Sequence, residues 1–432
     1  MDINSDQLTV AIRRNDYTEV ANLLDKGLDV NGVNSEGYRP LHEAVKGEYL
    51  DIVELLLKRS ANVNLFTTRF MITPLHLAVI WGHLEVVKLL ITYGASLETK
   101  CDIGLPPEIR SGISYTYYDR SCISDILKCE RFYVDGQGNF TTPLTLAADC
   151  DNIEVVKLLI EYGADVNNTN SDGCTVLHTF SGYGDEEIVS LLLQKESNLE
   201  ARINLCGSTP LHLATRNIEN NVIDLLVHAG ADVTAKDKNG QTPLDIACDI
   251  IINMDDCIFP LDSPFSFYYT KIFDYKAELL IKFMLLVSKD IEMPNIEYTA
   301  HEFCHELKRK YQENIEQMEA CLIENTTVSV YTFLQALYYN KKKLLTFLYN
   351  QQLRQEVKHI DKYISKYEKY SSIAPMVMKK VQESVTRLDL LEAADIAMEM
   401  IAPNLVLDCR RIILNYLSNY DLYSLTESVK CL

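Results

Sequence analysis

The sequence predicts an all-α protein with short β-hairpin loops, built as a stack of repeated helix pairs and continued by further helices. Three observations predict this class. A motif recurs along the first two-thirds of the chain, and apolar residues within each copy follow helical spacing. Helical spacing then continues without strand alternation. Because 432 residues are too many for one compact core, we expect more than one unit.

Six copies of the motif can be read directly from the sequence. They begin with RPLHEAV at Arg39, TPLHLAV at Thr73, TPLTLAA at Thr142, TVLHTFS at Thr175, TPLHLAT at Thr209 and TPLDIAC at Thr242. Successive starts differ by 34, 69, 33, 34 and 33 residues. Because 69 residues correspond to two periods, we expect a degenerate copy at about 101–138.

One copy shows why each element is expected. Thr142 can cap a helix N-terminus, and Pro143 suits the first turn, where a missing N–H costs nothing. Apolar residues at helical spacing then predict a second helix, which Gly163 ends in a left-handed conformation. The segment up to Asp172-Gly173 is expected to project as a hairpin. One such unit cannot bury its own apolar face, so the copies are expected to stack into a solenoid.

These motifs resemble the ankyrin repeat. The resemblance implies an ankyrin-repeat solenoid over 1–290, with a capping repeat at 1–35 and a last repeat that a loop interrupts at about 253–274. Target specificity in ankyrin repeats lies in variable hairpin tips and first-helix surfaces. The resulting candidates for target binding are Ser35, Glu36, Asn170, Ser171, Lys238 and Asn239.

Four histidines recur within the motifs, one per repeat. They are His42, His76, His178 and His212. In ankyrin repeats this position bridges the backbone and the threonine hydroxyl within and between repeats, so we interpret the four histidines as structural rather than catalytic.

Composition limits the classes of partner. There are 61 acidic and 41 basic side chains, giving a formal net charge of -20. A chain this acidic has no excess cations to release counterions from phosphate, so we expect neither nucleic acid nor membrane as a partner. The twelve cysteines form no CxxC pair, and the N-terminus lacks the pattern of a signal peptide. We therefore expect reduced thiols in a cytosolic protein.

Helical spacing continues over 291–400, which we expect to be a helical spacer, and the tail at 401–432 has a pattern of its own. The tail resembles the start of an F-box, with Leu-Ser at 417–418 and Asp-Leu at 421–422 at the expected offsets, although Val406 stands where proline is expected. The F-box-like residues that the resemblance assigns to docking are Leu405, Val406, Asp408, Ile413, Leu414, Leu417, Asp421 and Leu422.

Ankyrin repeats followed by a truncated F-box resemble the poxvirus ankyrin proteins with a PRANC domain. This resemblance implies a viral substrate adaptor in the host cytoplasm, with nuclear entry left open. The repeats would bind a host protein, and the tail would dock the Skp-type linker and the cullin of a host ubiquitin ligase, modulating antiviral defence or host range. The chain itself would be no enzyme and would need no cofactor, because other subunits transfer ubiquitin.

Two alternatives stay open. The first is an ankyrin scaffold that sequesters a host protein without recruiting a ligase. The second is a zinc metallopeptidase, because HEFCH at 301–305 fits H-E-x-x-H, in which two histidines on one helix face bind zinc and the glutamate acts as general base. The longer H-x-x-G-x-x-H extension is absent, and no phosphate-binding loop or nucleophile elbow accompanies it. We therefore favour a charged amphipathic helix at 301–305.

Overall fold

The computed structural model describes residues 3–68, 71–102, 140–217, 219–248, 278, 280–281, 283–285, 299–324, 326–339, 344, 347–348, 350–366 and 374–401. The chain divides into two compact units. The first comprises Met1–Leu226 with Ala235–Ile246, and the second comprises Val227–Thr234 with Ala247–Leu432. Each unit has its own buried apolar side chains.

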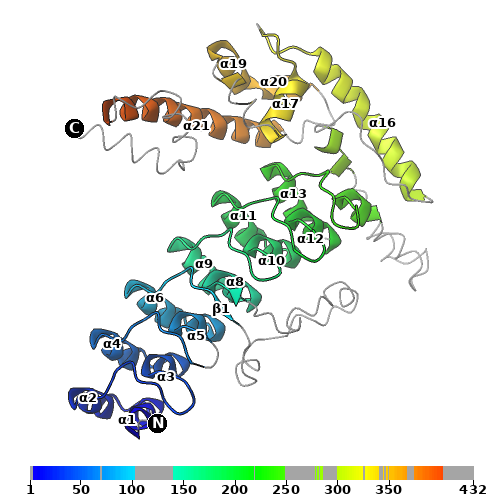
Figure 1. The fold of residues 1–432 in the computed structure, drawn as a ribbon. Coiled ribbons are helices and arrows are strands. Elements are labelled where there is room, and N and C mark those ends of the chain that lie inside the picture. The colour runs from blue at the N-terminus through cyan, green and yellow to red at the C-terminus, as the bar shows by residue number, and fades with distance from the viewer. Residues whose placement is uncertain are drawn as a thin grey trace. The chain divides into compact units, whose positions relative to one another are not determined.

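The first unit is a stack of helix pairs (Figure 1). The pairs are α1 (Ile3–Arg13) with α2 (Tyr17–Asp25), α3 (Pro40–Lys46) with α4 (Leu50–Lys58), α5 (Pro74–Trp81) with α6 (Leu84–Thr92), α8 (Pro143–Asp149) with α9 (Ile153–Glu161), α10 (Val176–Tyr183) with α11 (Glu186–Gln194), and α12 (Pro210–Arg216) with α13 (Asn220–Ala229). First helices pack against first helices of the neighbouring pair, as α1 does on α3 and α10 does on α12. The expected helical stack is thus confirmed.

Threonine and proline start the first helices, as the sequence predicts. The Thr142 hydroxyl accepts a hydrogen bond from the Thr145 N–H at 3.3 Å, and Pro143 occupies the first turn of α8. Thr73 caps α5 in the same way. At the far end of the repeat, Gly163 follows α9 with φ +87°, a conformation that glycine adopts without steric cost.

Apolar side chains fill the space between helix pairs. On α8, Leu144 and Leu146 are each 1% exposed, and on α9 both Val156 and Leu159 are fully buried. Burying a side chain of this size contributes roughly 1.5–3 kcal/mol. Because both faces of each inner pair are covered in this way, the stack depends on every repeat having neighbours.

The repeats on either side of residues 103–139 are direct neighbours. Helix α5 packs against α8 and α6 packs against α9, and Asn152 Nδ2 donates a 2.7 Å hydrogen bond to the Val79 carbonyl. Strand β1 (Cys101–Asp102) pairs antiparallel with β2 (Phe140–Thr141). The degenerate copy expected at about 101–138 stays a prediction, and the repeats that flank it are in direct contact with each other. Residues 103–139 themselves lie outside the described part of the chain.

Buried histidines connect consecutive repeats, in agreement with their structural interpretation. In three repeats the Nε2 atom lies close to a backbone carbonyl about one period further along the chain. These distances are 2.9 Å from His42 to Ile72, 3.2 Å from His178 to Ser208 and 3.1 Å from His212 to Gln241. In the remaining repeat, His76 Nδ1 lies 2.7 Å from the Thr73 hydroxyl.

Burial also keeps these imidazoles neutral. It lowers the pKa of His42 and of His76 to about 4, because the charged form loses its hydration in the core. The pKa of His212 is lowered for the same main reason. The bridges between repeats therefore depend on uncharged histidine at neutral pH.

The described part of the second unit is helical. Its elements are α16 (Thr299–Ala320), α17 (Val330–Tyr339), α19 (Gln351–Glu356), the 3-10 helix η1 (Val357–His359), α20 (Asp361–Ile364) and α21 (Ala374–Ile401). Along α21 the buried side chains recur every three or four residues, from Val377 and Val381 to Leu388 and Leu391. This spacing places them on one face of the helix.

Residues 278–285 were assigned by sequence to the last repeat, but they pack within the second unit. The Phe283 ring meets the Tyr338 ring edge-on, with centroids 5.4 Å apart. The Tyr331 hydroxyl donates a 3.2 Å hydrogen bond to the Leu285 carbonyl. The boundary between the compact units therefore differs from the expected one at 290, because these aromatic contacts tie the segment to α17. The expected loop at about 253–274 lies outside the described residues.

Charged side chains fix α21 within the second unit. Lys380 Nζ lies 4.1 Å from the centroid of the Tyr338 ring and donates to the carbonyls of His228 and Ala229 at 3.2 and 3.3 Å. These carbonyls lie at the C-terminus of α13, where a cation is favoured. Near the other end of the unit, Arg354 of α19 pairs with Glu392 at 3.0 Å.

Among the described residues, no helix is long and apolar enough to span a membrane.

We expect the stability of the repeat stack to fall when the pH is lowered from 7 to 5. His42 and His76 have a pKa of about 4 when folded and about 6.5 when unfolded, so the unfolded state binds more protons in this window. Each histidine then contributes a slope of up to about 1.4 kcal/mol per pH unit. Urea unfolding followed by circular dichroism measures the effect.

The His42→Gln variant provides the control for this pH dependence. It lacks one titrating imidazole, so its stability should change less between pH 7 and 5 than that of the unaltered chain, although its stability at pH 7 is lower. An unchanged slope would show that His42 does not contribute.

Candidate protein-binding surface

Three of the hairpin tips between repeats are built on one type of turn. The Asn170 side-chain oxygen accepts hydrogen bonds at 3.0 Å from the N–H groups of Asp172 and Cys174. Asn34 and Asp237 make the same arrangement in their own repeats. Asn and Asp favour such turns because their side chains imitate the backbone, and Gly173 completes this one with φ +76°. Each turn therefore holds its two central residues outward.

The predicted target-binding residues occupy these turns, but not all of them are available to a partner. The exposed ones are Ser35, Glu36, Ser171, Lys238 and Asn239. Asn170 is half-buried, and its side chain forms the turn itself. The Asn170 side chain therefore does not project toward a partner, because an Asn at the first position of this turn points back to the backbone.

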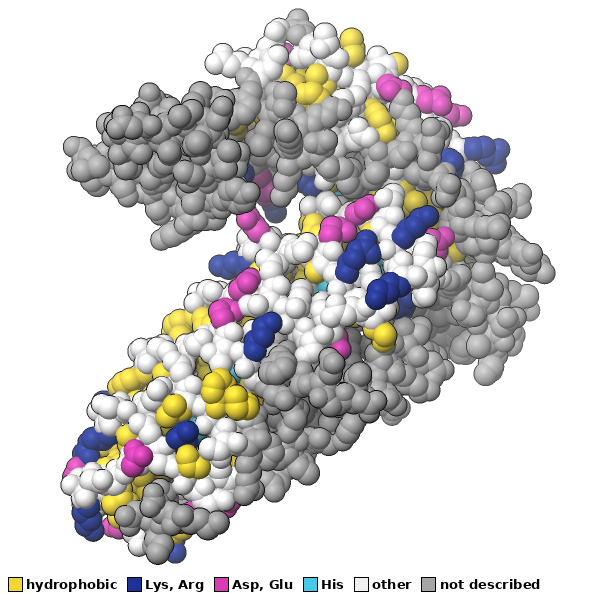
Figure 2. Space-filling model, viewed as in Figure 1, with side chains coloured by type: hydrophobic (Ala, Val, Ile, Leu, Met, Phe, Trp, Pro, Cys, Tyr) yellow, Lys and Arg dark blue, Asp and Glu magenta, His cyan; other side chains and the backbone are white. Residues whose placement is uncertain are grey.

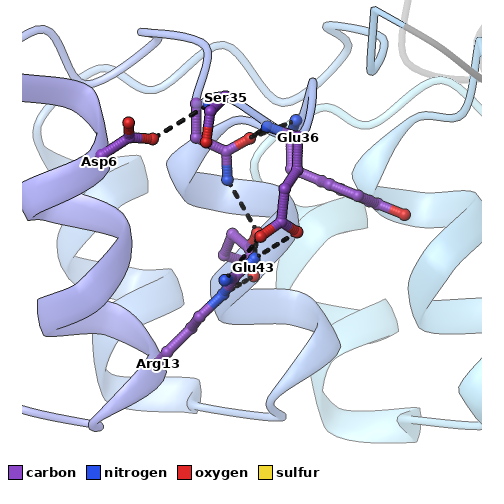
Figure 3. Close-up of polar contacts among 7 residues, drawn as sticks. Asp6, Arg13, Ser35, Glu36 and Glu43 are labelled. Carbon is purple, nitrogen blue, oxygen red and sulfur yellow. Dashed lines mark hydrogen bonds and ion pairs between the residues drawn. The ribbon is translucent and has the colours of Figure 1, made fainter. Parts of the chain in front are cut away.

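The first hairpin is attached to the N-terminal repeat (Figure 3). The Arg13 guanidinium donates to both Glu36 carboxylate oxygens, at 2.9 and 2.7 Å. The Ser35 N–H donates to Asp6 at 3.0 Å. Two of the predicted target-binding residues thus already hold α1 in place, which makes this hairpin less available to a partner.

Arg13 also reaches a carboxylate inside the stack. The Glu43 side chain is only 2% exposed, and it accepts a 2.7 Å hydrogen bond from Arg13 Nη2 and a 3.0 Å hydrogen bond from Asn34 Nδ2. Hydrogen bonds from Arg13 to Glu36 and to Glu43 raise the pKa of the guanidinium further. The buried carboxylate therefore depends on a residue of the capping repeat for its charge partner.

Three consecutive hairpins are hydrogen-bonded into a continuous surface. We call it the hairpin strip, comprising residues 170–173, 203–207 and 237–240. The Asn204 N–H donates to the Asp172 carbonyl at 2.6 Å, and the Lys238 N–H donates to the Cys206 carbonyl at 2.8 Å. Asn204 Nδ2 adds a 3.0 Å bond to the Ser171 carbonyl. Main-chain bonds of this kind fix the tips relative to one another.

Gly207 allows two of these hairpins to approach closely. Its φ is +70°, and a Cβ atom there would lie 3.0 Å from Lys238 Cγ and 3.1 Å from the Lys238 backbone nitrogen. Any other residue would push the hairpins apart or strain the turn. This close contact makes the last two tips act as one surface.

Leu205 is the residue that sequence reasoning missed. It lies at the tip of the central hairpin of the strip, and 68% of it is exposed. Its turn is one residue longer than the turn at 170–174: the Gly207 N–H donates to the Ile203 carbonyl at 2.8 Å, whereas the Gly173 N–H donates to the Asn170 carbonyl at 3.0 Å. An exposed leucine on a rigid turn is the kind of apolar contact that partners bury.

All the F-box-like residues, from Leu405 to Leu422, lie outside the described residues. HEFCH at 301–305 lies on α16, so the expected helix is present, but the side chains of these five residues are likewise not described. Among the described residues, no group of three His, Cys, Asp or Glu side chains could hold a metal ion.

Comparison with known proteins identifies the repeats. A family model described as ankyrin repeats (3 copies) matches residues 8–101 and 144–237. These segments are ankyrin repeats. The two matched segments lie in the first unit, except for Val227–Thr234, and they contain the whole hairpin strip apart from its last residues, 238–240.

Relatives match this ankyrin region rather than the whole chain. The chicken "Nuclear factor NF-kappa-B p105 subunit" is 38% identical over 111 residues, which cover 25% of this chain and 11% of the relative. The "Putative ankyrin repeat protein FPV031" of fowlpox virus is 34% identical over 103 residues, covering 23% of this chain and 30% of the relative. The chain thus spans less than a third of the length of these two relatives.

Among solved structures, the ankyrin repeat domain of Bcl-3 is 23% identical, with a TM-score of 0.42. The match covers 56% of this chain and 92% of that domain. Ankyrin repeats are protein-binding modules and are typically not enzymatic.

We expect the Arg13→Ala substitution to destabilise the repeat stack by about 2 kcal/mol. It removes the charge partner of the buried Glu43 carboxylate. Leaving a buried carboxylate unpaired costs more free energy of folding than the ion pair contributed. The matched control, Glu36→Ala, removes only the exposed partner and should cost less than about 1 kcal/mol. Chemical unfolding measures both.

A double variant separates charge from packing. Leucine occupies the equivalent of Glu43 in the repeats that contain Leu77 and Leu213. Arg13→Leu combined with Glu43→Leu should therefore recover most of the stability lost in Arg13→Ala. Equal losses in Arg13→Ala and Glu36→Ala would contradict the role given to Glu43.

Proposed function

We propose that this chain is an adaptor that binds a target protein through the hairpin strip of its ankyrin repeats and recruits a cullin-type ubiquitin ligase through its C-terminal residues. In this scheme the chain performs no chemistry itself. The repeats select the target, and the tail brings it to subunits that transfer ubiquitin.

Exposure of Leu205 on the hairpin strip carries the target-binding part. Interfaces depend on a few well-placed apolar or aromatic anchors, held by a scaffold that loses little entropy on binding. Leu205 fits this description, because it is 68% exposed while main-chain bonds of Asn204 and Lys238 hold its hairpin against both neighbours. Ser171 and Lys238 then lie beside it as polar contacts at the rim.

The ligase part rests on order along the chain and on the F-box-like spacing at 405–422. Helix α21 ends at Ile401, directly before the tail. Apolar residues such as Ile413 and Leu414, four and three residues before Leu417, are suited to a helix that docks into a groove. The ankyrin relative from fowlpox virus supports a link to poxviruses. Action in host cytoplasm against host defence is part of the proposal and follows from the adaptor role.

A scaffold that only sequesters its target is the second candidate. The described ankyrin repeats favour both candidates equally, since target binding is common to them. They differ only in whether the tail brings a linker and a cullin to the complex.

We expect Leu205→Asp to weaken target binding at least about tenfold, because it places a solvated charge in the centre of the interface. Target proteins captured by the full chain from host cells, and measured by quantitative mass spectrometry, should be lost in this variant. Leu322→Asp is the matched control, since Leu322 is also an exposed leucine, at 54%, but lies in the second unit. Equal capture by all three proteins would refute the assignment of the strip.

We expect the full chain to co-purify with the Skp-type linker and the cullin, and a variant with Ile413→Asp and Leu414→Asp to lose both. The charges would prevent burial of the docking helix. Target capture by the same variant should be unchanged, which also shows that it folds. A full chain that retains its target but brings down neither linker nor cullin supports the sequestering scaffold instead.

A further inference from the structure

The last two tips of the hairpin strip carry positive charge in an otherwise acidic protein. Residues 201–208 and 235–241 contain Arg202, Lys236 and Lys238 against the single carboxylate of Asp237, which gives three positive charges and one negative. The hairpins at 33–38 and 169–174 each contain one carboxylate and no cation. The chain as a whole has a net charge of -20. Positive charge on this face is thus concentrated at one end of the strip.

Two of the three cations, Arg202 and Lys238, are hydrogen-bonded to the backbone of the hairpin that carries Leu205. Arg202 Nη1 donates to the Gly207 carbonyl at 3.1 Å and to the Lys236 carbonyl at 2.6 Å, which joins the two hairpins. Lys238 Nζ donates to the Asn204 carbonyl at 2.5 Å, directly beside Leu205. Arg202, Lys236 and Lys238 are all exposed. Arg202 and Lys238 are therefore held at the hairpin of Leu205 while they remain accessible to solvent, and Lys236 is exposed on the adjacent hairpin.

The single carboxylate in these two hairpins does not neutralise the three positive charges at the surface. Asp237 is 6% exposed, and its oxygen accepts the turn hydrogen bonds from Asn239 and Gln241. A partner that lies on the tips therefore meets three cations and an apolar side chain. Figure 2 shows several Lys and Arg side chains close together on the face over α12.

We propose that the last two hairpins of the strip bind an acidic protein segment, in which an apolar side chain contacts Leu205 and flanking Asp or Glu side chains pair with Arg202, Lys236 and Lys238. This inference rests on the proposed target-binding function and names the chemistry of the target. Arg202 suits a carboxylate because its guanidinium donates in two parallel directions, and lysine adds point charge. Complementary charge also excludes basic segments with the same apolar anchor.

Peptide binding to the full chain tests the proposal. The probe is a short fluorescein-labelled peptide in which one leucine is flanked by aspartates, and fluorescence anisotropy measures its Kd. One comparison peptide has lysines in place of the aspartates, and another has serine in place of the leucine. We expect the aspartate–leucine peptide to bind at least about tenfold more tightly than either comparison peptide.

Charge reversal on the protein gives the second measurement. Lys236→Glu combined with Lys238→Glu should raise the Kd of the aspartate–leucine peptide at least about tenfold and reverse the preference toward the lysine peptide. The matched control is Lys26→Glu combined with Lys195→Glu, which changes the net charge equally at two exposed lysines away from the strip. Lys236→Gln, which leaves the Lys238 bond to Asn204 in place, should give a smaller loss in the same direction.

The outcomes separate this inference from the proposed function. Equal effects of the two double reversals, or equal binding of the three peptides, would overturn the acidic-segment proposal. If Leu205→Asp still abolishes capture of the cellular target in that case, the strip remains the binding surface and only its charge preference is wrong. If Leu205→Asp leaves capture intact, both proposals fail together.

Discussion

No helix pair in the first unit can cover its apolar residues alone. Val156 and Leu159 are fully buried where α9 packs against its own partner α8 and against α6 of the preceding pair. Stacking is therefore the condition for each repeat to fold, and it also fixes the distance between consecutive hairpins. The hairpin strip is a consequence of this constraint: once the helices stack, the tips come within range of the main-chain bonds made by Asn204 and Lys238.

Local signals made much of the stack predictable. Thr142, Pro143 and Gly163 each act through the backbone of their own repeat, so their roles can be read without knowing the neighbours. The packing of α5 on α8 could not be read in this way. The gap of two periods between the motifs at Thr73 and Thr142 gives only the length of chain between them. It does not show which helices of the flanking repeats pack together. The compact unit that contains 278–285 likewise depends on contacts in space, such as those of Phe283 and Leu285, rather than on spacing.

The candidate surface was predictable as a region but not residue by residue. Hairpin tips were expected to face a partner, and five of the six predicted residues are exposed. Asn170 differs because an Asn at the start of the turn is needed by the backbone. Leu205 was missed because leucine in a repeat protein is usually core. Its turn is also one residue longer than the neighbouring turns, because the Gly207 N–H donates to the carbonyl of Ile203 rather than to that of Asn204.

An acidic chain can still recognise an acidic segment, because net charge and local charge act over different distances. At physiological ionic strength the field of distant carboxylates is screened beyond roughly 8 Å. The distant acidic side chains therefore slow the approach of a like-charged target without weakening contacts at Leu205, Arg202 and Lys238 once they form. Added salt would relieve the first effect and weaken the second, so its net influence on affinity has no fixed sign. Substitutions in the last two hairpins change only the contact with the target segment. Their effect on affinity therefore measures recognition at this surface.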